Sequence, residues 1–134
     1  MSWLLDVNSQ LASRWTAHAD HTAVRVWLSQ QAEFYTSPIV EHGFMRVSLS
    51  PGYTTYSQDA HSSLLSFYFR PAHRFLADDL SPTDSPESFY MNTTDAHLVC
   101  LAVRHGLKLA TLDMMLLAKP LASGLAFNPI LETP

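Results

Sequence analysis

The sequence predicts an α/β protein in which helices cover the faces of a parallel sheet. Short runs of β-type residues alternate along the chain with segments whose apolar residues recur at helical spacing. This alternation is typical of parallel sheets with helical crossovers. The chain has 134 residues, 47% of them hydrophobic, which is enough to bury one core. We therefore expect a single domain spanning 1–134.

Strands are predicted where short runs are rich in aliphatic and aromatic residues. These runs are 3–5, 34–36, 73–77, 107–112 and 125–127. The first run is Trp-Leu-Leu, and the last is a candidate edge strand before a tail that contains proline.

Helices are predicted from the spacing of apolar residues and from residues that favour helix ends. They are expected over 20–31, 39–48, 55–69, 95–105 and 114–118. Ser37 and Pro38 have the residue types of a cap and a first helical position for the second helix. Thr94 is the expected cap of the fourth helix, and Gly106 its expected end.

Composition excludes several classes of protein. Twelve acidic residues against eight Lys and Arg give a net charge of -4, the wrong sign for holding nucleic acid by bulk charge. The four glycines are too far apart for a dinucleotide fingerprint or a P-loop. One cysteine cannot build a disulfide framework or a four-cysteine zinc site, and a reducing cytoplasm is the expected compartment.

No apolar stretch reaches the roughly 18 residues of a membrane span. The first residues also lack the basic start of a signal peptide. We therefore expect no membrane association.

Four acidic residues interrupt or adjoin apolar runs: Asp6, Glu41, Asp95 and Asp113. Each has a structural explanation when taken singly. Asp6 suits the turn after the first strand, Asp113 suits a strand end, and the other two suit first helical turns, where the helix dipole favours an anion.

The expected geometry brings these four acids together. A helix over 96–105 descends about 15 Å and the following strand climbs about 16 Å, so Asp113 returns to the level of Asp95. Asp6 directly follows a strand, and Glu41 follows one after a cap and a partial turn. All four therefore face the carboxyl edge of the sheet, where open α/β sheets bind ligands.

Clustered carboxylates need a counterion. Two of them about 4 to 5 Å apart repel each other by roughly 3 to 4 kcal/mol at an effective dielectric near 20. A divalent cation relieves this repulsion, and all-oxygen ligation selects Mg²⁺, with Mn²⁺ as a possible substitute. Such a pocket suits hydrolysis of a phosphodiester by an activated water.

Four blocks of the sequence closely resemble the PIN-domain ribonucleases, in particular the VapC-like toxins of bacterial type II toxin-antitoxin modules. The blocks begin at Leu4-Leu5-Asp6-Val7-Asn8, Ile39-Val40-Glu41-His42-Gly43, Thr94-Asp95-Ala96-His97-Leu98 and Gly106-Leu107-Lys108-Leu109-Ala110-Thr111-Leu112-Asp113. They occur in order and cover nearly the whole chain.

The resemblance implies a three-layer α/β/α sandwich with a parallel sheet of about five strands. It also implies endonucleolytic cleavage of RNA at a Mg²⁺ site formed by the four acids, with Asn8 and Thr94 helping to order the acidic pocket. Members of the family are held inactive by a small cognate antitoxin and commonly dimerise, so we expect a homodimer or a toxin-antitoxin hetero-oligomer.

RNA binding also requires cations near the acids. Arg14 and Arg46 follow the motif segments and are the candidates for RNA contact. A role as solvated surface charges is at least as consistent with their positions. The choice of RNA is expected to depend on surface loops such as 81–92.

Other functions fit parts of the sequence. His18 and His21 have a spacing that zinc hydrolases use, although no third ligand follows at a recognisable spacing. An aspartyl-phosphate phosphotransferase would use Asp6 as nucleophile, but Asn8 replaces its usual second aspartate. A catalytically silent module could use the acidic pocket to bind an arginine of a partner.

Overall fold

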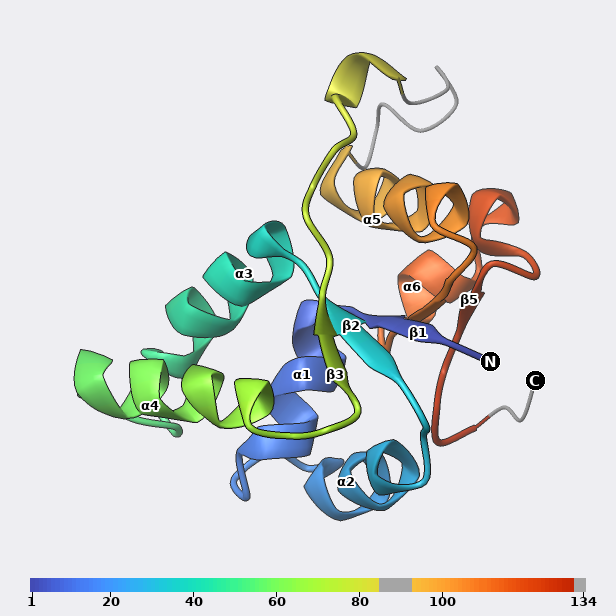
Figure 1. Ribbon diagram of the computed structural model, residues 1–134. Helices are drawn as coiled ribbons and strands as arrows, with labels where there is room; N and C mark the ends of the chain where they lie inside the picture. Colours follow the sequence, from blue (N-terminus) through green and yellow to red (C-terminus); the bar gives the residue numbers. More distant parts are fainter. Residues whose placement is uncertain (85–92, 132–134) are drawn as a thin grey trace.

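The computed structural model describes residues 1–84 and 93–131 and confirms the predicted α/β architecture (Figure 1). The strands are β1 (Trp3–Leu5), β2 (Phe34–Thr36), β3 (His73–Phe75), β4 (Lys108–Ala110) and β5 (Ala126–Phe127). The helices are α1 (Val7–Arg14), α2 (His21–Ser29), α3 (Pro38–Ser48), α4 (Ser57–Tyr68), α5 (Thr93–Arg104) and α6 (Met114–Leu117), with short 3-10 turns at Pro82–Asp84 and Pro120–Ala122.

All strand pairings in the sheet are parallel, and the strand order is β3-β2-β1-β4-β5. The chain builds outward from β1 to β2 and β3, and then crosses back to place β4 on the other side of β1. The order therefore reverses between β1 and β4. In open parallel sheets such a reversal opens a crevice beyond the carboxyl ends of the two strands.

The predicted strands and helices agree with the structure apart from their ends. The strands expected over 73–77 and 107–112 stop at Phe75 and Ala110. Helix α5 begins at Thr93, so Thr94 lies within its first turn and is not the cap that the sequence predicts. Cap positions inferred from sequence commonly differ by one or two residues from the observed helix end.

Helix α1 is absent from the sequence prediction. Its residues 9–13 are all buried, including Ser9, Gln10 and Ser13. A helix covered on several sides has no polar face, so the apolar spacing that marks a surface helix is missing here.

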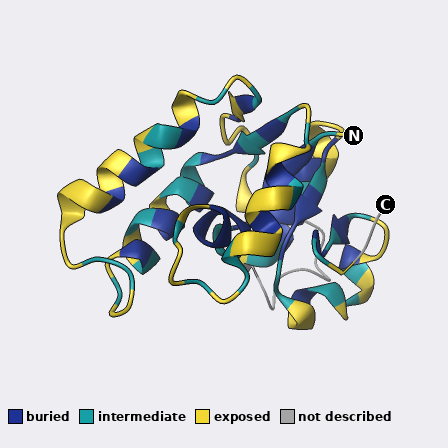
Figure 2. Cartoon of the chain, turned by 90° about the horizontal axis from the view of Figure 1, so that it is seen from below, coloured by how far each residue is buried: buried dark blue, intermediate teal, exposed yellow. Residues whose placement is uncertain are grey.

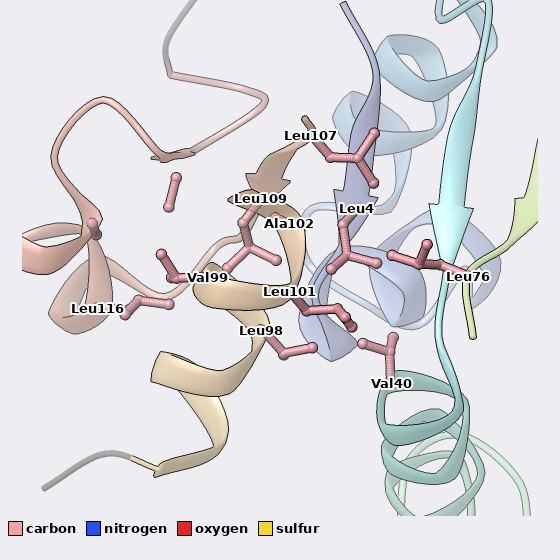
Figure 3. Packing of buried hydrophobic residues seen from close by; sticks show 12 residues of the cluster. Leu4, Val40, Leu76, Leu98, Val99, Leu101, Ala102, Leu107, Leu109 and Leu116 are labelled. Atoms are coloured by element: carbon pink, nitrogen blue, oxygen red, sulfur yellow. The ribbon is translucent and has the colours of Figure 1, made fainter. Parts of the chain in front are cut away.

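Two hydrophobic clusters cover the two faces of the sheet, which gives the three layers. The buried residues of strands and helices are dark blue in Figure 2. Leu4 packs with Leu98, Leu101 and Leu109 in the cluster under α5, part of which Figure 3 shows. Its neighbours on β1, Trp3 and Leu5, pack in the other cluster, which includes residues of α1, α2, α3 and α4. This alternation follows from the two-residue period of a strand.

Helices α1 and α3 approach each other closely at Gly43. A Cβ atom on this residue would lie 2.5 Å from Cγ2 of Val7, the first residue of α1. The glycine therefore lets α3 reach the start of α1, next to the end of β1. No helix within the described ranges is long and apolar enough to span a membrane.

Candidate active site at the carboxyl ends of the strands

The four acids predicted from the sequence lie on segments that reach the carboxyl edge of the sheet. Asp6 directly follows β1, and Asp113 follows β4 after two residues. These strands are neighbours at the point where the strand order reverses. Asp95 lies in the first turn of α5, and Glu41 lies in the first turn of α3, which follows β2. The carboxyl edge is where this sheet class binds ligands.

Asp6 is a buried carboxylate with both oxygens held, and only 7% of the residue is exposed. The backbone N–H of Val7 donates to Oδ1 at 2.7 Å, and the Thr111 hydroxyl donates to Oδ2 at 2.8 Å. Burial raises the pKa of the Asp6 carboxyl, and the charges of Asp95 and Asp113 raise it further against the effect of the two hydrogen bonds. Asp6 is thus fixed in place and short of positive charge.

Thr111 connects Asp6 to the segment that carries Asp113. Its hydroxyl accepts from the backbone N–H of Asp113 at 3.1 Å and from the side-chain amide of Asn8 at 3.5 Å. The amide oxygen of Asn8 accepts from the backbone N–H of Leu112 at 3.0 Å. Asn8 and Thr111 therefore tie the end of β4 to the start of α1.

Asp95 and Asp113 share the electrostatic environment of Asp6. Burial raises the pKa of Asp95, the charge of Asp113 raises it further, and Lys119 lowers it. Asp113 caps α6, because its Oδ1 accepts from the backbone N–H groups of Met115 and Leu116 at 3.0 and 3.2 Å. We call Asp6, Asp95 and Asp113 the acidic trio.

Glu41 is held by hydroxyl groups. The Tyr68 hydroxyl lies 2.8 Å from both carboxylate oxygens, and the Thr36 hydroxyl donates to Oε2 at 2.8 Å. Thr36 also lies 2.7 Å from Nε2 of His73. We call these four residues the Glu41 network.

His73 and Tyr68 both have strongly shifted protonation equilibria. Burial lowers the pKa of His73 to about 4, with help from the nearby charges of Arg74 and Arg70. Burial and the hydrogen bond to Glu41 raise the pKa of Tyr68 above its usual range. Both side chains are therefore neutral at neutral pH.

The acids fit a hard divalent cation by their chemistry, because all their donor atoms are oxygens and the charges within the trio raise the pKa of Asp6 and of Asp95. Across residues 1–84 and 93–131, however, no three His, Cys, Asp or Glu side chains stand close enough together to hold a metal ion as they are. A metal would have to draw the carboxylates together. The joint metal site of the four acids therefore stays a prediction.

The remaining predicted residues lie at varied distances from the acids. Asn8 belongs to the Thr111 hydrogen bonds, and Thr94 lines a cavity of about 260 Å³ with Ile39 and His97. Arg14 ends α1, about 10 Å along the helix axis from the end next to Asp6. Its guanidinium lies 5.8 Å from the ring centre of Trp15.

Arg46 is exposed near the end of α3. RNA contact by either arginine stays a prediction. Of the loop 81–92, Pro82–Asp84 form a 3-10 turn and residues 85–92 lie outside the described residues.

Sequence reasoning did not assign Thr111, Tyr68, Thr36 or Lys119 to the site. Thr111 lies only two residues before Asp113 in the sequence. This short separation could have identified Thr111 as a candidate for the site. Tyr68 is 27 residues from Glu41 in sequence, and only the packing of α4 beside α3 brings the two together.

The zinc alternative gains no support from His18 and His21. Nδ1 of His18 accepts from the backbone N–H of Asp20 at 3.0 Å, and Nδ1 of His21 lies 2.7 Å from the carbonyl oxygen of Ala12. Only one nitrogen of each ring is engaged. Zinc is disfavoured instead because no three His, Cys, Asp or Glu side chains of the described residues stand close enough together to hold a metal ion.

The fold and the acids together define an open parallel α/β protein with carboxylates at the strand-order reversal of its sheet. No family model matches the chain. The chain is 39% identical over 118 residues to ribonuclease VapC38 of Mycobacterium tuberculosis strain H37Rv, which covers 82% of this chain and 84% of that protein. It is 33% identical over 127 residues to ribonuclease VapC39 of the same organism, covering 87% and 91%. The chain therefore belongs to the VapC ribonuclease family.

A solved structure supports the fold. The crystal structure of Mycobacterium tuberculosis VapC20, described as a toxin that cleaves the sarcin-ricin loop, matches 87% of this chain and 93% of that one. The TM-score is 0.65 at 14% sequence identity. This match confirms the predicted PIN-like fold. The phosphotransferase alternative finds no support in these comparisons.

Proposed function

We propose that this chain is a Mg²⁺-dependent endoribonuclease and the toxin of a type II toxin-antitoxin module. Membership of the VapC ribonuclease family supports the reaction class. The observation that carries the metal dependence is Asp6, a buried carboxylate beside Asp95 and Asp113 whose pKa is raised by burial and by their charges. A cation at this position would relieve both penalties.

Asp6, Asp95 and Asp113, together with Glu41, would hold the metal. Bound there, Mg²⁺ or Mn²⁺ supplies charge neutralisation at the scissile phosphate and lowers the pKa of a water molecule. The protein contributes orientation: Thr111 and the Val7 N–H fix one oxygen each of Asp6. A side chain that is already fixed loses less conformational freedom when a metal binds to it, which favours metal binding.

The acids alone would repel an RNA phosphate, so cations must support binding. Lys119 is one cation near the acids, because its charge lowers the pKa of Asp95. We propose Lys119 as a phosphate contact, and Arg14 and Arg46 remain the candidates that the sequence suggests.

The proposed partners are an RNA substrate and a small cognate antitoxin that blocks the acidic site. A homodimer or a toxin-antitoxin hetero-oligomer is the expected assembly, and the cytoplasm is the expected compartment. An antitoxin-sized reading frame immediately upstream would support this part of the proposal. Its product should co-purify with the chain and inhibit RNA cleavage.

The test is incubation of the purified protein with single-stranded and structured RNA in Mg²⁺, Mn²⁺ or chelator. Cuts should appear with either metal and vanish on chelation. Asp6→Asn and Asp95→Asn should lose cleavage while remaining folded by circular dichroism. Undiminished cutting by either variant would refute the site, and a folded wild-type protein that binds RNA or a partner without cutting would favour the silent interaction module.

A further inference from the structure

A cavity of about 260 Å³ lies beside the carboxyl edge of the sheet, between the starts of α3 and α5 and the segment that follows β3. Ile39 of α3 and Thr94 of α5 line it. Thr94 immediately precedes Asp95, and Ile39 stands two residues before Glu41. A group bound in this cavity would therefore lie next to the candidate active site.

The third wall of the cavity is the segment 76–82, which leaves β3 and runs beside α5 (Figure 1). Two neighbouring acids fasten this segment to α5. Asp78 lies 2.8 Å from Nε2 of His97, and Asp79 lies 2.9 Å from Nε2 of His105. Of these two pairs, Asp78 and His97 line the cavity, whereas Asp79 and His105 do not.

The Asp78 carboxylate is held in place but keeps room for another donor. Nε2 of His97 lies 2.9 Å from Oδ1 and 2.8 Å from Oδ2, so one N–H is shared between the two oxygens. Oδ1 also accepts from the backbone N–H of Leu80 at 3.3 Å. An ionised carboxylate has about four lone-pair positions, so Oδ2 can accept once more. The side chain is 24% exposed, so a ligand can reach it.

The lining of the cavity suits a flat ring with polar edges. Ile39, Leu80 and Pro82 are apolar, and Asp78 and Thr94 supply polar groups. Bases of single-stranded RNA are commonly bound in this way and read along their polar edges. Cytosine, adenine and guanine carry an amino group that can donate to a carboxylate. The ring N–H of uracil lies between two carbonyl oxygens, which a carboxylate repels.

We infer that this cavity holds a nucleobase of the RNA, and that Asp78 makes the protein prefer an amino-bearing base to uracil there. The inference rests on the proposed function, because it takes RNA as the ligand. An arginine of a protein partner is the other group that a carboxylate commonly binds, and its planar fork uses both oxygens. Oδ1 of Asp78 already accepts from two N–H groups, so its free capacity suits a single amino group better.

The test is binding of end-labelled short oligouridines in chelator, measured by fluorescence anisotropy. The central residue is either cytidine or uridine, which have rings of the same size but carry an amino or a carbonyl group. The wild type should bind the cytidine oligonucleotide about tenfold more tightly, as expected for one hydrogen bond to a charged group. Asp78→Asn offers both a donor and an acceptor, so it should bind the two alike while still accepting from His97.

The matched control is Asp79→Asn, which makes the same change one residue further along, outside the cavity. It should keep the preference for cytidine. Thr94→Phe places a large side chain at an exposed position of the lining and should abolish the preference. A wild type without preference, a preference that survives in Asp78→Asn or Thr94→Phe, or equal losses in Asp78→Asn and Asp79→Asn would each overturn the inference.

Cleavage in Mg²⁺ distinguishes this failure from failure of the proposed function. If the wild type cleaves RNA but shows no base preference that depends on Asp78, only the inferred base site is refuted. If the preference is present in chelator and no RNA is cleaved with metal, the proposed function is refuted and the base site stands. Binding of a short arginine peptide that depends on Asp78, without any base preference, would assign the cavity to a protein partner and overturn the inference.

Discussion

The two parts of the candidate site stabilise their carboxylates in different ways. In the acidic trio, Asp6 is buried, and negative neighbours raise its pKa. In the Glu41 network, two hydroxyl groups donate to one carboxylate, which is only half-buried. Hydrogen bonds satisfy the oxygens of Glu41 without supplying charge, whereas Asp6 combines hydrogen bonds with uncompensated negative charge.

This difference indicates a division of roles. The acidic trio is where a cation gains most, because neutralising three clustered charges removes their repulsion. The Glu41 network is where geometry is fixed, because neutral donors orient a carboxylate without competing for a cation by charge. Destabilised carboxylates such as those of the acidic trio are typical of functional sites, where activity is retained at the expense of stability.

The largest effect is expected at Asp6. Asp6→Asn should lower the RNA cleavage rate at least a hundredfold, because it removes one metal-binding charge. It should also raise the midpoint of thermal unfolding in chelator, because it removes a buried charge. The gain is reduced by the loss of one acceptor, since the single amide oxygen can accept from Val7 N–H or from Thr111 but not replace both carboxylate oxygens. Cleavage assays and thermal unfolding measure the two effects. A fall in stability together with activity would show that Asp6 has a structural role.

The next effect is expected at Thr111. Thr111→Val keeps the shape but removes the hydroxyl that serves Asp6 and the Asp113 N–H, so it should destabilise the protein by about 1–3 kcal/mol. Denaturant unfolding measures this change. Thr111→Ser retains the hydroxyl and should lose much less. Equal losses in the two variants would mean that the methyl group, rather than the hydrogen bonds, matters.

A smaller effect is expected where the two parts of the site meet. Gly43→Ala would push its Cβ into Val7 and should cost about 1–3 kcal/mol for overpacking, reduced by about 1 kcal/mol for the better helix former. Adding Val7→Ala should recover part of the loss, because it removes the atoms that clash. Chemical denaturation of the four proteins in the cycle checks this, and strict additivity would contradict the contact.

The smallest effect is a dependence of stability on pH. The raised pKa values of Asp6 and Asp95 mean that the native state binds more protons than the unfolded state between about pH 4, the unfolded value, and the native pKa. The free energy of unfolding should therefore decrease as pH rises through this window, by at most about 1.4 kcal/mol per pH unit for each group. Unfolding in chelator at several pH values measures it.

Asp6→Asn should make the free energy of unfolding fall less steeply as pH rises. Glu41→Gln, from the other part of the site, is the variant for comparison. The pH profile of Asp6→Asn would contradict the prediction if it paralleled that of the wild type.

Much of the fold could be predicted because its signals are local. The strands at Trp3–Leu5 and Phe34–Thr36 and the helix after Pro38 follow from residue type, spacing and caps. Helix α1 could not be predicted this way, since burial of Ser9, Gln10 and Ser13 depends on the sheet and helices around them. The start of α5 was predicted two residues too late, because helix ends have weak signals in the sequence.

The candidate site shows the same contrast between local sequence signals and tertiary packing. The sequence by itself determined which acids follow strands or begin helices, because a parallel sheet sends the ends of its strands to one edge. Only the tertiary structure decided what each acid contacts. Thr111 reaches Asp6 across 105 positions and Tyr68 reaches Glu41 across 27. Such contacts depend on how separate elements pack, and no periodicity within one element records that packing.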